Sequence, residues 1–324
     1  MNIATIGTSS ITERFIDALG KTDALTFAGA FSRSADKAKK LGAPRIFTDL
    51  EELARDKSIE VVYVASPNSL HFEQAMFLME HQKHIICEKP MFSTSAELTE
   101  AFQRADEYGV FLFEAFRNLY TPNHHRLKAA IEKVGPIRHS FLQYMKYSSR
   151  YDNVLAGEEP NIFSPSFSGG ALVDLGVYPI SLAVSLFGKP DAVSAQVVKL
   201  STGVDGSGSV LLDYGTHTCT AMFSKITNSS LPGEISGENG TIVLDHVAPI
   251  SSIEFTDRLS GEKEQLAVSE EENDMMYEAE VIAAAIQSND RAVYEQYRSI
   301  SEIVIHITEE ARKQNQIVYA AEKK

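Results

Sequence analysis

Lys89, Asp174 and Tyr178 have the types and spacing that proton transfer at an alcohol or carbonyl group requires. Lys89 follows a short apolar run, which predicts a position at the end of a strand. Asp174 and Tyr178 are four residues apart, so a helix there places them on one face. An ammonium group polarises a carbonyl and favours tyrosinate over the neutral phenol, and a carboxylate accepts hydrogen bonds from hydroxyl groups or holds the lysine. This chemistry needs no metal ion.

The elements expected to position Lys89 are short apolar strands that alternate with amphipathic helices over the first 115 residues. This alternation predicts parallel pairing with right-handed crossovers, and six such strands form a doubly wound nucleotide-binding sheet. Capping boxes are expected at three helix starts, Ser10 with Glu13, Thr48 with Glu51 and Thr94 with Glu97. The expected strands are Ile3–Ile6, Leu25–Phe31, Arg45–Phe47, Val61–Ala65, His84–Cys87 and Val110–Phe113.

The pattern changes after about residue 118, where strand-like runs follow one another with tight glycine-bearing turns. Such turns indicate an antiparallel sheet. We therefore expect two domains, a dinucleotide-binding domain over 1–118 and a substrate-binding and oligomerisation domain over 119–324. Helices are expected over Pro122–Val134, Gly176–Phe187, Glu271–Gln287 and Arg298–Gln314. Strands are expected over Ile137–Tyr147, Ala192–Leu200, Ser207–Tyr214, Thr216–Ser224, Leu231–Ser236, Thr241–Leu244, Ser252–Phe255 and Glu264–Val268.

The turn after the first strand has the place of a pyrophosphate-binding loop. Backbone amides at a helix N-terminus attract phosphate, and dinucleotide folds carry G-x-G-x-x-G there. Gly7 is the one glycine present, with Ser9 and Thr12 at the other two positions, so an ordinary strand-to-helix turn is the alternative. The candidate phosphate ligands are Gly7, Thr8, Ser9, Ser10 and Ile11. Gly20-Lys21-Thr22 is not a P-loop, because Phe15 stands where the loop needs its first glycine.

The end of the second strand bears on the choice between NAD and NADP. An acidic residue there binds the ribose 2′-hydroxyl of NAD, whereas an arginine suits the 2′-phosphate of NADP. The chain has Ser32 and Arg33 at this point, and Asp36 lies too far into the following helix to replace the acid. We therefore favour NADP, with NAD as the alternative. A solvated loop with Ser34 as a helix cap explains the same residues without a cofactor.

Four motifs together resemble the Gfo/Idh/MocA family of NAD(P)-dependent oxidoreductases over essentially the whole chain. Tyr178, where other members carry histidine, resembles the glucose–fructose oxidoreductase and dimeric dihydrodiol dehydrogenase branch; the inositol dehydrogenase type usually has histidine there. The motifs are Glu88-Lys89-Pro90; Gly169-Gly170 through Leu172, Asp174 and Gly176 to Tyr178; Ser66-Pro67-Asn68 with His71; and Glu114-Ala115-Phe116 with Pro122.

The resemblance implies a Rossmann domain followed by an α/β domain with an open, mostly antiparallel sheet, through which members form homodimers or homotetramers. It implies that Lys89 is the catalytic lysine, that Asp174 orients the substrate and that Tyr178 is the general acid/base. The substrate would be a sugar, polyol, dihydrodiol or small dicarbonyl. The further residues it assigns to the cofactor site are Ser66, Pro67, Asn68, His71 and Glu88.

Three residues are candidates for contact with the substrate, and each has a second explanation. Arg117 either binds a carboxylated substrate or pairs with Glu114 or Asp106. His124 either reaches the substrate cleft from the start of a helix or is exposed at the surface. Tyr151 either contacts a sugar or packs against a face of the sheet.

Composition and charge exclude several classes. A net charge of −14 argues against nucleic acid and anionic membranes as partners. Two cysteines cannot build a disulfide framework or a four-cysteine zinc site. The chain shows neither a signal peptide nor an apolar run of about 18 residues. We therefore expect a cytoplasmic enzyme without a bound metal.

Two other functions fit parts of the sequence. A non-catalytic NAD(P)-binding regulatory protein of the same fold would bind the cofactor without turnover, but such proteins often lose the lysine or its acid/base partner. A methyltransferase with a Rossmann domain would bind adenosyl-methionine, and nothing after residue 118 favours it. The presence of Lys89, Asp174 and Tyr178 together favours the oxidoreductase.

Overall fold

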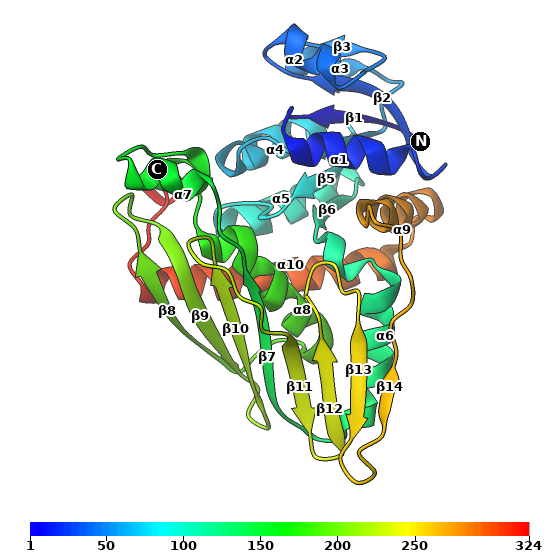
Figure 1. Ribbon diagram of the computed structural model, residues 1–324. Helices are drawn as coiled ribbons and strands as arrows, with labels where there is room; N and C mark the ends of the chain where they lie inside the picture. The colour runs from blue at the N-terminus through cyan, green and yellow to red at the C-terminus, as the bar shows by residue number, and fades with distance from the viewer. Residues whose placement is uncertain (324) are drawn as a thin grey trace. The chain divides into compact units, whose positions relative to one another are not determined.

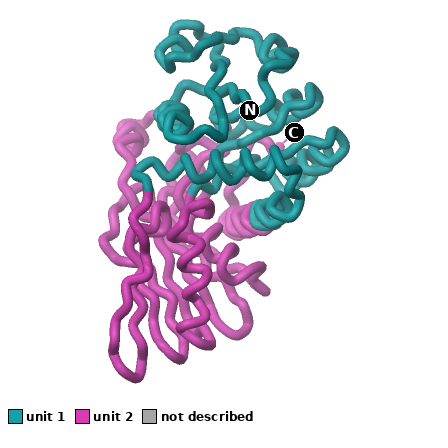
Figure 2. The backbone as a smooth tube through the Cα atoms, turned by 90° about the vertical axis from the view of Figure 1, so that its right-hand side faces the viewer, with its two compact units in different colours: residues 1–117, 271–302 teal, residues 118–270, 303–324 magenta. Residues whose placement is uncertain are grey.

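The computed structural model describes residues 1–323 and divides into two compact units. The first unit combines Met1–Arg117 with Glu271–Glu302, and the second combines Asn118–Glu270 with Ile303–Lys324. Figure 2 draws 271–302 in the colour of the first unit. The structure thus differs from a single division at residue 118. The helices within residues 271–302 pack their apolar faces against the rest of the first unit. Their local sequence pattern does not predict this packing.

The first unit is built on a six-stranded parallel sheet in the order β3-β2-β1-β4-β5-β6, as the doubly wound prediction requires. All four residues of β4 are buried, because helices cover both faces of such a sheet. The strands are β1 (Asn2–Ile6), β2 (Thr26–Phe31), β3 (Ile46–Phe47), β4 (Val61–Val64), β5 (His84–Glu88) and β6 (Leu112–Ala115). The sixth begins two residues later than expected.

Seven α-helices have residues in the first unit, and α10 passes into the second unit after Glu302. Thr94 and Glu97 form the expected capping box. The other two capping boxes were wrong: α1 begins after Ser9, whose side chain makes no capping bond, and Asp49 caps α3 by accepting from the amide of Glu51. The helices are α1 (Ser10–Leu19), α2 (Ala35–Lys40), α3 (Leu50–Arg55), α4 (His71–Glu80), α5 (Ser95–Tyr108), α9 (Met275–Ser288) and α10 (Arg291–Gln314).

The second unit is an eight-stranded sheet in the order β14-β13-β12-β11-β7-β10-β9-β8 (Figure 1). Every neighbouring pair is antiparallel except β7 with β10, which confirms the mostly antiparallel prediction. The strands are β7 (Ile137–Met145), β8 (Ala192–Lys199), β9 (Asp205–Asp213), β10 (Thr218–Ser224), β11 (Gly233–Gly237), β12 (Gly240–Leu244), β13 (Ile253–Asp257) and β14 (Lys263–Gln265).

One face of this sheet is covered by the apolar helix α8 (Val177–Phe187), which packs against β7 and β10. The helix ends at Gly188, as its glycine and the following proline predict. Besides the end of α10, the other α-helices of the unit are α6 (Pro122–Ala130), which Thr121 caps, and the short α7 (Arg150–Leu155).

By length and composition alone, the helical stretch Pro165–Phe187 is long and apolar enough to cross a membrane. The sequence analysis did not predict such a stretch. In its apolar window 72% of the residues are buried inside the protein. Because the core helix of a folded domain passes the same test, this stretch is weak evidence for a membrane span.

Candidate active site

The parallel pairing of β1, β4, β5 and β6 places the ends of these strands at one edge of the first sheet. The turns that follow the strands therefore gather there, where open α/β sheets bind ligands. These turns carry Gly7 after β1, Ser66 after β4 and Lys89 after β5. The structure thus places the turns that carry Gly7, Ser66 and Lys89 at one edge of the sheet.

Gly7 is required at its position because its backbone φ is +112° and a Cβ atom there would collide with the carbonyl oxygen of Ala65. The amides of the first turn of α1 have no side-chain cap from Ser9, which leaves them available to an anion. The hydroxyl of Thr12 is buried beside Gly7 without a hydrogen-bond partner. A turn of this kind fits a pyrophosphate group.

The turn after β2 carries a cation and no acid. Arg33 is exposed, and Ser32 accepts a hydrogen bond from the amide of Ser34 at 3.2 Å. The nearest acid in sequence, Asp36, lies on α2 and pairs with Lys39 on the solvent side. The preference for NADP over NAD that these residues favour stays a prediction.

Two buried glutamates hold the backbone of the loop that carries Lys89. Glu88 accepts from the amide of Lys89 at 3.2 Å and from the hydroxyl of Tyr63 at 2.5 Å. Glu114, at the end of β6, accepts from the amide of Met91 at 2.9 Å. Burial raises the pKa of both carboxyls, that of Glu114 to about 7, and the Lys89 ammonium partly offsets this for Glu88.

His71 connects the turns after β4 and β5. Its side chain is buried, with Nε2 2.8 Å from the carbonyl oxygen of Ser66 and Nδ1 3.1 Å from that of Met91. Burial lowers the pKa of His71, so the ring is neutral near pH 7. These contacts make His71 a brace between the two turns, and direct contact with the cofactor stays a prediction.

Arg117 is buried and forms an ion pair with Asp274, which Arg14 also contacts at 2.8 Å. Sequence analysis had proposed Glu114 or Asp106 as its ion-pair partner, and the structure gives a different acid. Arg298 contacts Asp106 instead, at 2.8 Å. Glu278, one turn after Asp274, is fully buried and its pKa is raised well above the ordinary value, mainly by burial and then by the charge of Glu88.

In the second unit, Asp174 and Tyr178 lie on one continuous helical stretch, but not on a regular α-helix. The turn Leu172–Gly176 is π-helical and leads directly into α8. The wider turn changes the angle between residues four apart, so the expected shared face is only approximate. Asp205 is fully buried and accepts from the amide of Leu172 at 2.6 Å, which fixes the start of this turn.

Lys225 was missed by the sequence analysis. It follows β10, and its ammonium group forms an ion pair with Asp174. No local signal marked it, because a single lysine after a strand usually lies at the surface and its partner is far away in sequence. The pairing follows from the packing of the π-helical turn against β10.

Tyr178 belongs to a small aromatic group in the second unit. Its ring centroid lies 5.4 Å from that of Tyr144, whose ring meets His246 edge-on at 4.5 Å. Nδ1 of His246 accepts from the amide of Ala248 at 2.9 Å, so the ring carries its proton on Nε2 when neutral. The ring of Tyr178 thus packs at an angle against that of Tyr144.

The other two candidates for contact with the substrate, His124 and Tyr151, differ in how deeply they are buried. His124 is buried, and its Nε2 lies 2.8 Å from the hydroxyl of Ser185. Burial lowers the pKa of His124 to about 3, which makes it a neutral core histidine. Tyr151 is half-buried, with Tyr147 and Phe163 as ring neighbours. For both residues, contact with the substrate stays a prediction.

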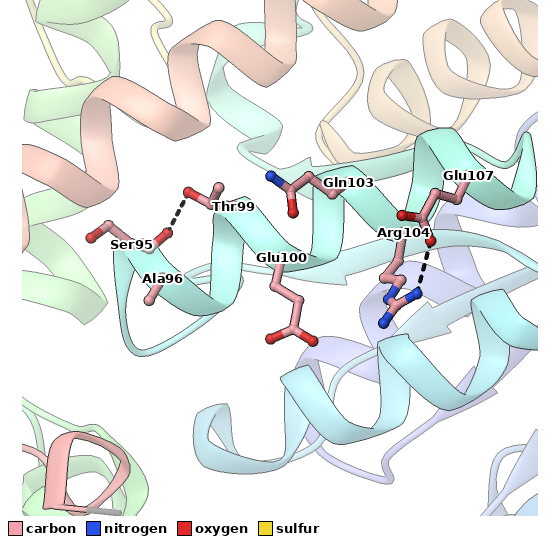
Figure 3. A pocket seen from close by; sticks show the side chains of 7 residues that line it. All are labelled: Ser95, Ala96, Thr99, Glu100, Gln103, Arg104 and Glu107. Atoms are coloured by element: carbon pink, nitrogen blue, oxygen red, sulfur yellow. Dashed lines mark hydrogen bonds and ion pairs between the residues drawn. The ribbon is translucent and has the colours of Figure 1, made fainter.

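A surface hollow lies away from the candidate site residues, and the described residues contain no cluster of metal ligands. A hollow of about 590 Å³ along α5 contains none of the candidate site residues (Figure 3). It is lined by Ser95, Ala96, Thr99, Glu100, Gln103, Arg104 and Glu107. Within residues 1–323 there is no group of three or more His, Cys, Asp or Glu side chains that could hold a metal ion.

Comparison with known proteins identifies the family. Residues 1–116 match the family described as "Oxidoreductase family, NAD-binding Rossmann fold", and residues 124–243 match the "GFO/IDH/MocA C-terminal domain". The chain is also 40% identical to the Bacillus subtilis protein named scyllo-inositol 2-dehydrogenase (NADP(+)) IolU, over 99% of each. The chain belongs to the Gfo/Idh/MocA family. It is an oxidoreductase with an NAD(P)-binding Rossmann domain, as the motifs predicted.

Two further comparisons concern a more distant relative and a solved structure. The mouse protein named trans-1,2-dihydrobenzene-1,2-diol dehydrogenase is 27% identical, over 90% of this chain and 88% of that one. The inositol enzyme is therefore more similar, although the sequence resemblance associated its type with histidine in place of Tyr178. The Actinomadura kijaniata 3-ketoreductase KijD10, solved with NADP, shares the fold with a TM-score of 0.82 over 97% of both chains at 20% identity.

Glu114 generates a prediction about pH and stability. Because its pKa in the folded chain lies above the ordinary 4.5, its protonated form contributes stability that is full below pH 4.5 and is lost as pH rises through about 7. The lost contribution is roughly 3 kcal/mol. Glu114→Gln mimics the neutral acid, so urea unfolding at pH 5 and pH 8 should show a smaller loss of stability than in the unmodified chain.

The matched control is Glu100→Gln, which changes an exposed glutamate of α5 in the same way. It should leave the loss of stability between pH 5 and pH 8 unchanged. A Glu114→Gln chain that lost as much stability as the unmodified one would show that this carboxyl does not titrate in the range assigned to it.

Proposed function

We propose that this chain is an NADP-dependent dehydrogenase that oxidises a secondary CH–OH group of a neutral, cyclic polyol, or reduces the corresponding ketone. The observation that most supports this proposal is the 40% identity, over 99% of both chains, to the relative whose name gives scyllo-inositol and NADP. Lys89 at the end of β5, with Asp174 and Tyr178 on one helical stretch, supplies the groups that such a reaction needs.

The choice of NADP is supported by the turn after β2. Arg33 is exposed there, and that turn lacks a carboxylate for a ribose hydroxyl. The pyrophosphate would lie at the N-terminus of α1, which has no side-chain cap. Gly7, which has no side chain, would allow the backbone to come close to it. Ser66, Pro67 and Asn68, in the turn after β4, would also line the cofactor. When bound, the nicotinamide accepts or gives the hydride.

In the proposed reaction each catalytic side chain has one task. Tyr178 takes the proton of the substrate hydroxyl during oxidation and returns it during reduction. The Lys89 ammonium stabilises negative charge on the reacting oxygen. Asp174 accepts hydrogen bonds from substrate hydroxyls and so orients the ring. The buried Glu88 and Glu114 keep the backbone of the Lys89 loop in place.

We further propose that the chain forms homodimers or homotetramers through the uncovered face of the second sheet, in the cytoplasm. Val198 and Leu211 are 55% and 42% exposed, on adjacent strands. Ser194 pairs with Leu211, and residues two apart in a strand share a face, so Val198 and Leu211 lie on the same face. Large apolar side chains exposed on one face favour burial against another copy. Two free, buried thiols, Cys87 and Cys219, suit a reducing compartment.

The activity is tested by following NADPH absorbance with a panel of inositols, sugars and dihydrodiols. Lys89→Met and Tyr178→Phe should each lower kcat/KM about 1,000-fold, because each removes a group that acts on the reacting oxygen. Lys57→Met, a change at an exposed lysine, is the control and should retain full activity. Turnover that survives both active-site changes would reject the mechanism. NADP binding without turnover on any substrate would favour the regulatory alternative.

Cofactor preference is tested with Arg33→Ala. A hydrogen bond between charged groups contributes about 1.5–3 kcal/mol, so its loss should lower the preference for NADP over NAD roughly 10- to 100-fold. The change should leave kcat/KM with NAD nearly constant, since NAD has no 2′-phosphate. The measurement is kcat/KM for both cofactors, with Arg55→Ala at an exposed arginine of α3 as control. An unchanged ratio would remove Arg33 from the cofactor site.

Assembly is tested by light scattering during gel filtration. The unmodified chain should have at least twice the mass of one chain. Leu211→Glu places a charge on the apolar face and should shift the population toward single chains, whereas Leu259→Glu, in an exposed turn, should not. A single-chain mass for the unmodified protein at micromolar concentration would contradict the proposed assembly.

A further inference from the structure

Lys225 is a buried lysine whose main chain and side chain are both held. Its amide donates to the carbonyl of Gly206 at 2.8 Å, and its carbonyl accepts from the amide of Ser148 at 2.9 Å. Only 6% of its side chain is exposed, and its ammonium group forms the ion pair with Asp174. The ring of Phe163 lies 5.9 Å from Nζ, on an apolar side of the lysine.

Stability alone does not account for this ion pair. Removing two charges from water costs several kcal/mol per ion, and a buried pair often contributes no more than apolar residues of the same volume. The pair is also unequal, because the side chain of Asp174 is 27% exposed while that of Lys225 is almost completely covered. The lysine therefore approaches the carboxylate from the interior of the second unit and leaves part of the carboxylate accessible.

The position of Asp174 depends on both its backbone and its side chain. Its backbone belongs to the π-helical turn, which Asp205 holds at the amide of Leu172. A Cβ atom at Gly170 would collide with Asp205, so the glycine is needed for this approach. At its other end the side chain is held through Oδ2 by Lys225. Backbone and carboxylate are thus fixed by two separate buried charges.

We propose that Lys225 is the positioning residue of Asp174, which it keeps ionised and oriented as a hydrogen-bond acceptor for the hydroxyl groups of a neutral polyol. This inference rests on the proposed function. An ammonium group beside a carboxylate disfavours its protonation, so Asp174 is unsuited to take the substrate proton and that task falls to Tyr178. Because the two charges cancel, the pair does not select for a charged substrate.

The expected consequence concerns substrate orientation. Misplacing a positioning group by about 1 Å costs on the order of 100-fold in rate. Lys225→Met should therefore lower kcat/KM for the polyol about 100-fold. The affinity for NADP, measured by calorimetry, should stay within twofold, because the candidate cofactor residues belong to the other compact unit. Without the ammonium group, Asp174 should protonate more easily, so the acid limb of the kcat/KM profile should move to higher pH.

The experiment compares Lys225→Met, Asp174→Asn and the double variant with the unmodified enzyme. If Lys225 acts through Asp174, the double variant should be no less active than Asp174→Asn alone, because the lysine then has no carboxylate to hold. The double variant also leaves no unpaired buried charge, so it should fold even where a single variant is unstable. Lys263→Met is the control, since Lys263 lies on the exposed strand β14 and contacts Glu254 of β13 at 2.7 Å.

The outcomes separate this inference from the proposed function. Absence of turnover by the unmodified enzyme on every polyol would overturn the proposed function and, with it, the substrate part of this inference. Turnover by the unmodified enzyme, together with Lys225→Met activity within threefold and the same pH profile, would overturn the role of Lys225 alone. Losses that multiply in the double variant would show that the lysine acts independently of Asp174, which also contradicts the proposal.

Discussion

The buried carboxylates at the ends of β5 and β6 are the constraint on which the first unit depends. A loop of consecutive amides and carbonyls at the edge of a sheet needs partners, and here side chains supply them. Glu88 accepts from the amide of Lys89, Glu114 accepts from that of Met91, and His71 lies against the loop's carbonyl oxygens. Burying these carboxylates is unfavourable, as their raised pKa values show. The hydrogen bonds that they accept from the loop amides offset this cost and favour one arrangement of the loop.

Buried charged side chains also hold a segment of the second unit, and one of them is a lysine, not an acid. There the buried Asp205 holds the start of the π-helical turn, and the buried Lys225 contacts the carboxylate that the turn presents. In both units a polar group with little exposure fixes a more exposed one. The more exposed groups are therefore positioned from the interior, where water does not compete for their partners.

Much of the fold could be predicted because its signals are local. Continuous apolar runs such as Val61–Val64 indicate buried parallel strands, and Thr94 with Glu97 marks a helix start by side chains that bond to nearby amides. The motifs that contain Lys89, Asp174 and Tyr178 led to the family that the comparisons confirmed, while the roles of these three side chains stay predictions.

The remaining features depend on contacts between distant segments. Lys225 meets Asp174 only because β10 packs against the π-helical turn, and no pattern in either segment records the meeting. Arg117 pairs with Asp274, more than 150 residues away in sequence, where nearer acids were expected. Residues 271–302 join the first unit by packing. Ser10 and Thr48 carried the spacing of capping boxes, but the helices began at neighbouring residues.

Gly7 shows which part of a glycine-rich fingerprint is set by steric demand. The strand-to-helix turn has no room for a Cβ atom at this one residue, because the carbonyl of Ala65, which follows the adjacent strand β4, occupies the space. Ser9 and Thr12 fit the same turn with side chains in place. A search that demands three glycines would pass over this chain. A search for a lone glycine after a first buried strand, checked against the neighbouring strand's carbonyl, would find it.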